Sequence, residues 1–109
     1  MANTFKLKTK ANVGVTTVGI YTAPASTTTV VIGITLANTS GAGVNVGVGI
    51  TRAGATEDVK LLKNAPIPQG SSLEVMQGNK IVVEASDTVT AKSDVNSTLD
   101  VALTIMEIT

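Results

Sequence analysis

Residues 29–52 read TVVIGITLANTSGAGVNVGVGITR, and this stretch decides the fold class. In both of its arms, large aliphatic residues alternate with small or polar ones. The residues predicted to point inward are Val30, Ile32, Ile34, Leu36, Val44, Val46, Val48 and Ile50. A period of two predicts half-buried strands, and the Ser-Gly-Ala-Gly between the arms suits a tight reversal. The stretch therefore predicts a long antiparallel hairpin with one aliphatic face.

The opposite face of this predicted hairpin is nearly without bulk. Its members are Val31, Gly33, Thr35, Ala37, Asn45, Gly47, Gly49 and Thr51. Because these side chains are small, the face is expected to be flat and poorly suited to clasping a ligand.

The rest of the chain predicts further short strands separated by turn residues. They span residues 1–10, 17–22, 59–62, 73–76, 80–84, 88–91 and 99–108. The last of these alternates Leu99, Val101, Leu103 and Ile105 with smaller or polar residues, and its length suits a central position. About eight strands without an amphipathic helix predict an all-β fold, a single antiparallel β-sandwich that is immunoglobulin-like or jelly-roll-like.

Three segments carry particular predictions. Residues 66–70 contain two prolines, which remove ladder donors, so we expect a loop that crosses between sheets. For residues 56–64 a short helix capped by Thr56 is an alternative to the strand. Gly78 and Asn79 favour a tight turn between two late strands.

Composition bounds the domain count and the partners. The chain has 109 residues, which fits one domain spanning residues 1–109. Its formal net charge is zero, from 8 basic and 8 acidic residues, so we expect neither nucleic acid nor a membrane surface as partner. No apolar run follows the N-terminal lysines, so no signal peptide is predicted.

Missing residue types exclude most catalytic chemistry. The chain contains no Cys and no His, so thiol catalysis, thiolate metal sites and imidazole bases are excluded. Glu57 and Asp58 are the only adjacent acids, and neighbours on a strand point to opposite faces. We therefore expect no enzyme activity and no catalytic, cofactor or metal site. Aromatic platforms for glycans or single-stranded nucleic acid are also scarce, since Phe5 and Tyr21 are the only aromatic residues.

The candidate site residues are the lysines of the first ten residues. Lys6, Lys8 and Lys10 alternate with Phe5, Leu7 and Thr9, so a strand here has one partly apolar side and one basic side. Such lysines can protect an edge strand against unwanted pairing. Alternatively, residues 1–10 form an arm that docks on an acidic neighbour, because residues 81–109 carry five acids and one lysine.

A family resemblance adds to this interpretation. The segments ANVGVTTVGIYTAPASTTTVVIGITLAN, ITRAG, LLKNAPIPQGSSLEV, KIVVEASDTVTAKS and LDVALTIMEIT resemble small virion structural proteins of tailed bacteriophages, notably phages of cyanobacteria. The resemblance covers most of residues 11–109, and YTAPAS, TLAN and NAPIPQGSSLEV are its most specific pieces. It implies a β-sandwich present in many copies on the particle.

Two classes of function follow from the sequence. The first is a non-enzymatic virion protein that decorates a capsid lattice, or a component of a neck or tail ring or fibre. Its expected partners are the major capsid protein or neck and tail proteins, together with copies of itself. The second is a receptor-binding or glycan-binding adhesion module, for which Tyr21 and a few isolated acids are the only candidate ligands.

Overall fold

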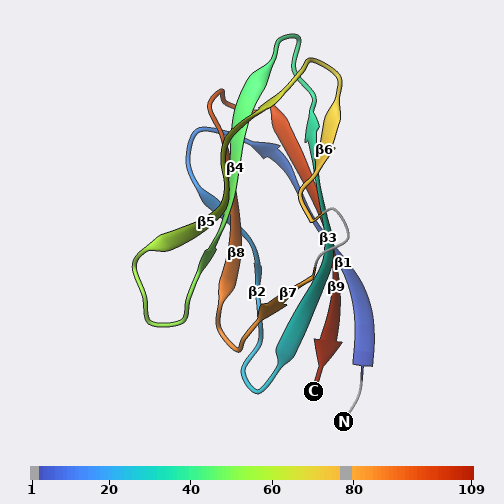
Figure 1. Cartoon of the computed structure of the whole chain (residues 1–109), viewed down its shortest axis with the longest axis vertical. Helices are drawn as coiled ribbons and strands as arrows, with labels where there is room; N and C mark the ends of the chain where they lie inside the picture. The colour runs from blue at the N-terminus through green and yellow to red at the C-terminus, as the bar shows by residue number, and fades with distance from the viewer. Residues whose placement is uncertain (1–2, 77–79) are drawn as a thin grey trace.

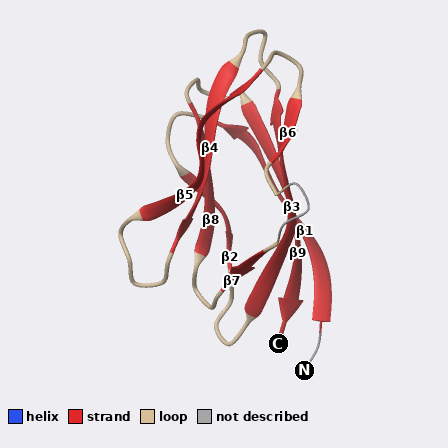
Figure 2. Ribbon diagram, viewed as in Figure 1, coloured by secondary structure: helices blue, strands red, loops and turns tan. Residues whose placement is uncertain are grey.

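The computed structural model describes residues 3–76 and 80–109, and this part of the chain is all β without a helix. Its strands are β1 (Asn3–Val13), β2 (Val18–Thr22), β3 (Thr28–Asn38), β4 (Val44–Thr51), β5 (Asp58–Ile67), β6 (Ser72–Glu74), β7 (Ile81–Val83), β8 (Thr88–Ser93) and β9 (Leu99–Ile108). They form two antiparallel sheets packed together (Figure 1 and Figure 2). The predicted β-sandwich is confirmed.

Sheet A has the order β1-β9-β3, and both β6 and β7 pair along the far side of β3. Sheet B has the order β2-β8-β4-β5. The closing strand β9 lies between β1 and β3, which confirms its predicted central position. Its predicted inward residues are all buried, at 0–3% exposure.

The predicted hairpin of residues 29–52 is wrong. Its first arm, β3, belongs to sheet A and its second arm, β4, belongs to sheet B. The chain crosses the sandwich between them, so the two aliphatic faces oppose each other in the core (Figure 1). Alternation shows that each strand has an apolar face, but it is equally compatible with pairing in one sheet and with facing across two.

Asn38 holds this crossing in place. Its side chain is 3% exposed, and its Nδ2 donates hydrogen bonds to the carbonyl oxygens of Ala42, Ile67 and Pro68 at 2.8, 3.0 and 3.3 Å. Its Oδ1 accepts from the backbone N–H of Ser40 at 2.9 Å. One side chain thus supplies the hydrogen bonds that a paired hairpin would have supplied through its backbone.

A β-bulge reverses the faces in the first half of β3. Opposite β9, Val31 pairs with Ile105 and Gly33 with Thr104, so Ile32 is an extra residue. An extra residue shifts the alternation by one position. Val31, predicted to point outward, is 1% exposed, whereas Val30 and Ile32, predicted to point inward, are only partly buried. Beyond the bulge, Ile34 and Leu36 point inward as predicted.

The prediction for the second arm, β4, is confirmed, whereas the prediction of a loop at residues 66–70 is wrong for Pro66 and Ile67. All four aliphatic residues of β4 predicted to point inward are buried. In contrast, β5 continues through Pro66, which pairs with Asn45, although a loop was predicted there. An edge strand uses only half of its backbone groups in the ladder, so proline is tolerated. The crossing to sheet A follows after Ile67, and the alternative helix at Thr56 is wrong because β5 occupies most of that segment.

The two late strands do not form the predicted hairpin, because both run antiparallel to β3 and therefore run in the same direction. Gly78 and Asn79 lie outside the described residues. The strands on either side of them, β6 and β7, both pair with β3: Leu73 lies opposite Leu36, and Val82 lies opposite Val30. Both therefore extend sheet A at the same side of β3.

Candidate functional site

The three candidate lysines lie in a row on β1, which forms one edge of sheet A in the described structure. Lys6, Lys8 and Lys10 pair across the strand with Ile105, Leu103 and Val101 of β9, which all point into the core. Cross-strand partners share a face, so the lysines lie on the inner side of the sheet at its open edge. Inward-pointing charge protects an edge strand against pairing with another chain. Docking through these lysines stays a prediction.

Lys6 is exposed, but its amine pairs with a buried polar network that joins the two sheets. Its Nζ lies 2.9 Å from Oε1 of Glu107, whose side chain is 8% exposed. The Tyr21 hydroxyl donates to Oε2 of Glu107 at 2.6 Å and lies 2.8 Å from Oγ1 of Thr29. Tyr21 comes from sheet B and the other three residues from sheet A, so the network cross-links the sandwich.

The network shifts two pKa values. Hydrogen bonds from Tyr21 and Lys6 outweigh burial and lower the pKa of Glu107 below its ordinary 4.5. Burial, together with the bond to Glu107, raises the pKa of Tyr21 from 10.0 to about 12. The fold therefore favours an ionised Glu107 and a neutral Tyr21.

These shifts predict how stability depends on pH. The Glu107 contribution is complete above its unfolded pKa and is lost as pH falls through the lower folded value. The Tyr21 contribution is complete below pH 10.0 and is lost as pH rises toward about 12. We expect urea midpoints to decrease in both directions and Tyr21→Phe to reduce the alkaline loss. An unchanged alkaline loss in that variant would contradict the assignment to Tyr21.

The acidic excess of residues 81–109 does not form one docking surface. Glu107 and Asp87 are 6% and 2% exposed. Asp87 accepts the backbone N–H groups of Ala53 and Glu84 at 2.8 and 3.1 Å and pairs with Arg52 at 2.9 Å. Burial opposes ionisation of Asp87, but these bonds outweigh it and lower its pKa. Both acids are thus used inside the fold.

Asp58 is held by its neighbours rather than by Glu57. Its Oδ1 accepts from the hydroxyls of Thr90 and Thr51 at 2.7 and 3.2 Å, and its Oδ2 lies 2.7 Å from Nζ of Lys60. A Cβ at Gly49 would lie 2.5 Å from that Oδ2, so the glycine makes room for the carboxylate. The bonds outweigh burial and lower the pKa of Asp58.

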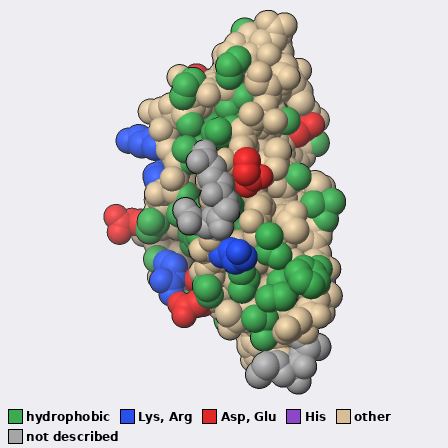
Figure 3. All heavy atoms as spheres, turned by 45° about the vertical axis from the view of Figure 1, so that its right-hand side comes forward, with side chains coloured by type: hydrophobic (Ala, Val, Ile, Leu, Met, Phe, Trp, Pro, Cys, Tyr) green, Lys and Arg blue, Asp and Glu red, His purple; other side chains and the backbone are tan. Residues whose placement is uncertain are grey.

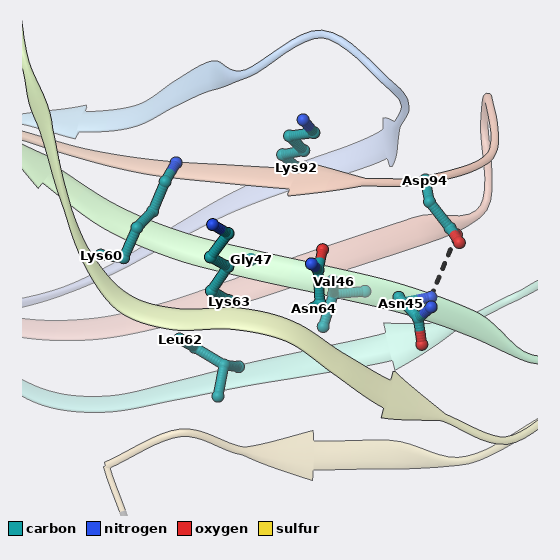
Figure 4. Close-up of a pocket in the computed structure, with 9 residues that line it drawn as sticks. All are labelled: Asn45, Val46, Gly47, Lys60, Leu62, Lys63, Asn64, Lys92 and Asp94. Carbon is teal, nitrogen blue, oxygen red and sulfur yellow. Dashed lines mark hydrogen bonds between the residues drawn. The ribbon is translucent and has the colours of Figure 1, made fainter.

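A shallow basic groove of about 80 Å³ lies on the outer face of sheet B, and the sequence did not predict it. Lys60 and Lys63 come from β5 and Lys92 from β8, and all three surround Gly47 (Figure 4). Asp94 closes one end, where its carboxylate accepts the backbone N–H of Asn45 at 3.0 Å. Lys60 and Lys63 are neighbours on β5, but Lys92 is distant in sequence, so only the pairing of β4 with both β5 and β8 brings the three lysines together.

The apolar side of β1 faces solvent. Phe5 and Leu7 are 69% and 65% exposed. In register, Phe5 lies beside Met106 of β9, which lies beside Val30 of β3 and then Val82 of β7. We call these four residues the apolar row. The sequence indicated that β1 has an apolar side, but only the sheet shows that this side points outward.

Two negative findings concern the described residues. Within residues 3–76 and 80–109, there is no cluster of three or more acidic, His or Cys side chains that could hold a metal ion. The same part of the chain contains no helix that is long and apolar enough to cross a membrane.

Comparisons with known proteins show a shared fold. No protein-family model and no curated protein matches this chain. A chain from the disulfide-linked pili of Bacillus endospore appendages is 18% identical with a TM-score of 0.57, covering 99% of this chain and 87% of that one. A chain from the acidic stable capsid of Helicobacter pylori bacteriophage KHP30 is 9% identical with a TM-score of 0.58, covering 100% of this chain and 94% of that one. This chain is therefore a β-sandwich similar in fold to a chain of a bacterial pilus and to a chain of a phage capsid.

Proposed function

We propose that this protein is a non-enzymatic structural protein of a phage virion, where it binds a repeating protein lattice as a capsid decoration or cement protein. The sequence resemblance to phage virion proteins and the fold shared with a phage capsid chain support this proposal. A place in a neck or tail ring or fibre is the alternative within the same class.

The observation that carries the proposal is the contrast between the interior and the outer surface. The buried carboxylates of Glu107 and Asp87 already form ion pairs with residues of the same chain. Among the described residues, no buried side-chain nitrogen or oxygen lacks a hydrogen-bond partner. Outside, Phe5 and Leu7 stand exposed on an edge strand. Exposed apolar groups on a flat sheet suit a protein partner rather than a small substrate.

Copies of this protein cannot be joined by disulfide bonds. The pili whose chain has a similar fold are disulfide-linked, whereas this chain contains no cysteine. A contact between copies of this chain must therefore rest on other interactions than disulfides.

The structure counts against the glycan-binding alternative. Tyr21 was the leading aromatic candidate, but it is 6% exposed and its hydroxyl is occupied by Glu107 and Thr29. The other aromatic residue, Phe5, lies opposite the apolar Met106, which offers no hydrogen bond to a sugar hydroxyl.

Copy number on purified particles tests the proposal. We expect hundreds of copies per virion if the protein decorates the head, and tens of copies in a multiple of the ring symmetry if it belongs to the neck or tail. Absence of the protein from purified virions would refute the virion assignment.

A charge-reversal variant tests docking through β1. We expect Lys8→Glu with Lys10→Glu to remain folded, because Lys10 is exposed and Lys8 is only partly buried at the sheet edge, where charges contribute little to stability, and to lose occupancy on stripped particles. Lys6 is retained because it pairs with the buried Glu107. Occupancy of the unmodified protein is expected to decrease as salt increases.

The matched control is Lys63→Glu with Lys92→Glu, which reverses two charges in the groove on sheet B. Circular dichroism checks the fold of both variants. Full occupancy by the folded β1 variant at low and high salt would assign its lysines to edge protection alone.

A further inference from the structure

The outer face of sheet A carries large side chains at one end and small ones at the other. The large end is the apolar row, with Leu7 one step further along β1. Phe5, Leu7 and Val82 are 69%, 65% and 57% exposed. Figure 3 turns this side of the molecule forward and shows hydrophobic side chains gathered in its lower half. These side chains project from the sheet as knobs.

The small end of the same face is a hollow of about 240 Å³. Its lining comes from the same three strands that carry most of the apolar row, β1, β9 and β3. The residues that give it its shape are Thr9, Ala11, Thr35, Ala37 and Ala102. Lys10 and Asp100 also line it, and Asp100 already accepts the backbone N–H of Asn12 at 3.1 Å. The small side chains of alanine and threonine leave empty space above the sheet here, whereas at the other end of the face the larger side chains of the apolar row occupy the corresponding space.

We infer that a second copy of this chain packs on this face, so that the apolar row of each copy enters the hollow of the other. We place a two-fold axis between the sheet A faces of the two copies, perpendicular to the strands and parallel to the sheets. This axis reverses the strand direction of the partner. It therefore places the large end of each copy over the small end of the other, with Leu7 near the axis. Such an isologous contact uses one surface twice.

A second copy fits this face better than an unrelated partner does. The knobs and the hollow occupy adjoining parts of the same three strands, so the surface is complementary to itself. The apolar row contains no charged residue, the hollow is lined by one cation and one anion, Lys10 and Asp100, and the chain has a formal net charge of zero. Two copies thus approach without burying like charges against each other. A strongly charged partner would find no counter-charge in the row.

The size of the face predicts the strength of the contact. Four strands about 4.8 Å apart and six residue steps of about 3.4 Å give roughly 400 Å² of sheet per copy. Two copies together would cover roughly 800 Å², which is less than the roughly 1,000 Å² expected of a stable specific interface and is typical of weak, transient complexes. We therefore expect a dimer that forms at high concentration in solution and is reinforced when many copies are held close together on a scaffold.

Sedimentation velocity over a concentration series of the purified full chain tests the inference. We expect a concentration-dependent dimer and at least a tenfold increase in its dissociation constant for Leu7→Ser, because each dimer loses two such contacts. Ala102→Arg fills the hollow and is expected to abolish the dimer. Val59→Ser is the matched control, since Val59 is 58% exposed on β5 of sheet B and should leave the dimer unchanged. Circular dichroism and thermal melts confirm that each variant folds.

The outcomes separate this inference from the proposed function. A monomer at every concentration, or a dimer that neither Leu7→Ser nor Ala102→Arg weakens, overturns the contact. Monomeric protein that binds stripped particles through Leu7 also overturns it, because the face would then serve a different partner while the virion role stands. A dimer lost in both variants but retained in Val59→Ser supports the inference whether or not the protein decorates a virion.

Discussion

Replacing Leu103 with alanine is expected to reduce the free energy of unfolding by about 2–5 kcal/mol, and replacing Ile34 with alanine should have a similar effect. The two residues are 0% and 1% exposed and lie directly opposite each other on β9 and β3. Both side chains point toward sheet B in the middle of the core. Each truncation removes buried apolar surface and leaves a cavity that the surrounding strands fill only in part. Urea melts at pH 7 measure the loss.

Thr35→Ala is the control for this prediction. Thr35 follows Ile34 on β3 but is exposed on the outer face, where its hydroxyl donates to Glu74 at 2.9 Å. We expect a loss of about 0.5 kcal/mol, as for most surface substitutions. Equal losses at Ile34 and Thr35 would show that the faces of β3 are assigned wrongly.

The second large effect is expected at the crossing between the sheets. Asn38→Ala removes the donors for the carbonyl oxygens of Ala42, Ile67 and Pro68. A buried acceptor left without a partner costs about 1–3 kcal/mol. Asn38→Asp keeps the shape but places a carboxylate against these three carbonyls. We expect Asn38→Asp to be more destabilising than Asn38→Ala at pH 7.

Asn45→Ala is the matched control for Asn38, because Asn45 is exposed at the start of β4 and its backbone rather than its side chain bonds to Asp94. Urea melts at pH 7 and pH 3 compare the variants. Protonation of the new carboxyl at low pH should restore part of the loss in Asn38→Asp relative to Asn38→Ala. If Asn38→Ala is as stable as Asn45→Ala, the side chain does not hold the crossing.

Local patterns predicted the strands but not how they meet. The periodicity of residues 44–51 and 99–108 correctly identified the buried faces of β4 and β9. The same reasoning failed at Val30 and Ile32, because one extra residue in β3 has no signature in a run of aliphatic side chains. It also failed at Pro66, since tolerance of proline depends on whether a strand lies at an edge.

For the candidate surfaces too, the sequence showed which residues alternate, and strand pairing decided where they lie. The alternation of lysine with Phe5 and Leu7 was evident from the sequence, but whether the basic or the apolar side faces the core depends on the pairing of β1 with β9. The bond between Tyr21 and Glu107 joins residues 86 positions apart, and no local pattern indicates it. The groove around Gly47 likewise exists only because β5 and β8 flank β4.

The sequence by itself determined the all-β class, most strand positions and the exclusion of thiol and imidazole chemistry, because these depend on residue type and on a period of two along the chain. Only the tertiary structure decided that β3 and β4 face each other across the core and that the apolar side of β1 points outward. Strand pairing joins residues distant in sequence, and many registers satisfy the same alternation. The arrangement that buries the inner aliphatic faces of β3, β4 and β9 and, among the described residues, leaves no buried side-chain nitrogen or oxygen without a partner is a property of the whole chain.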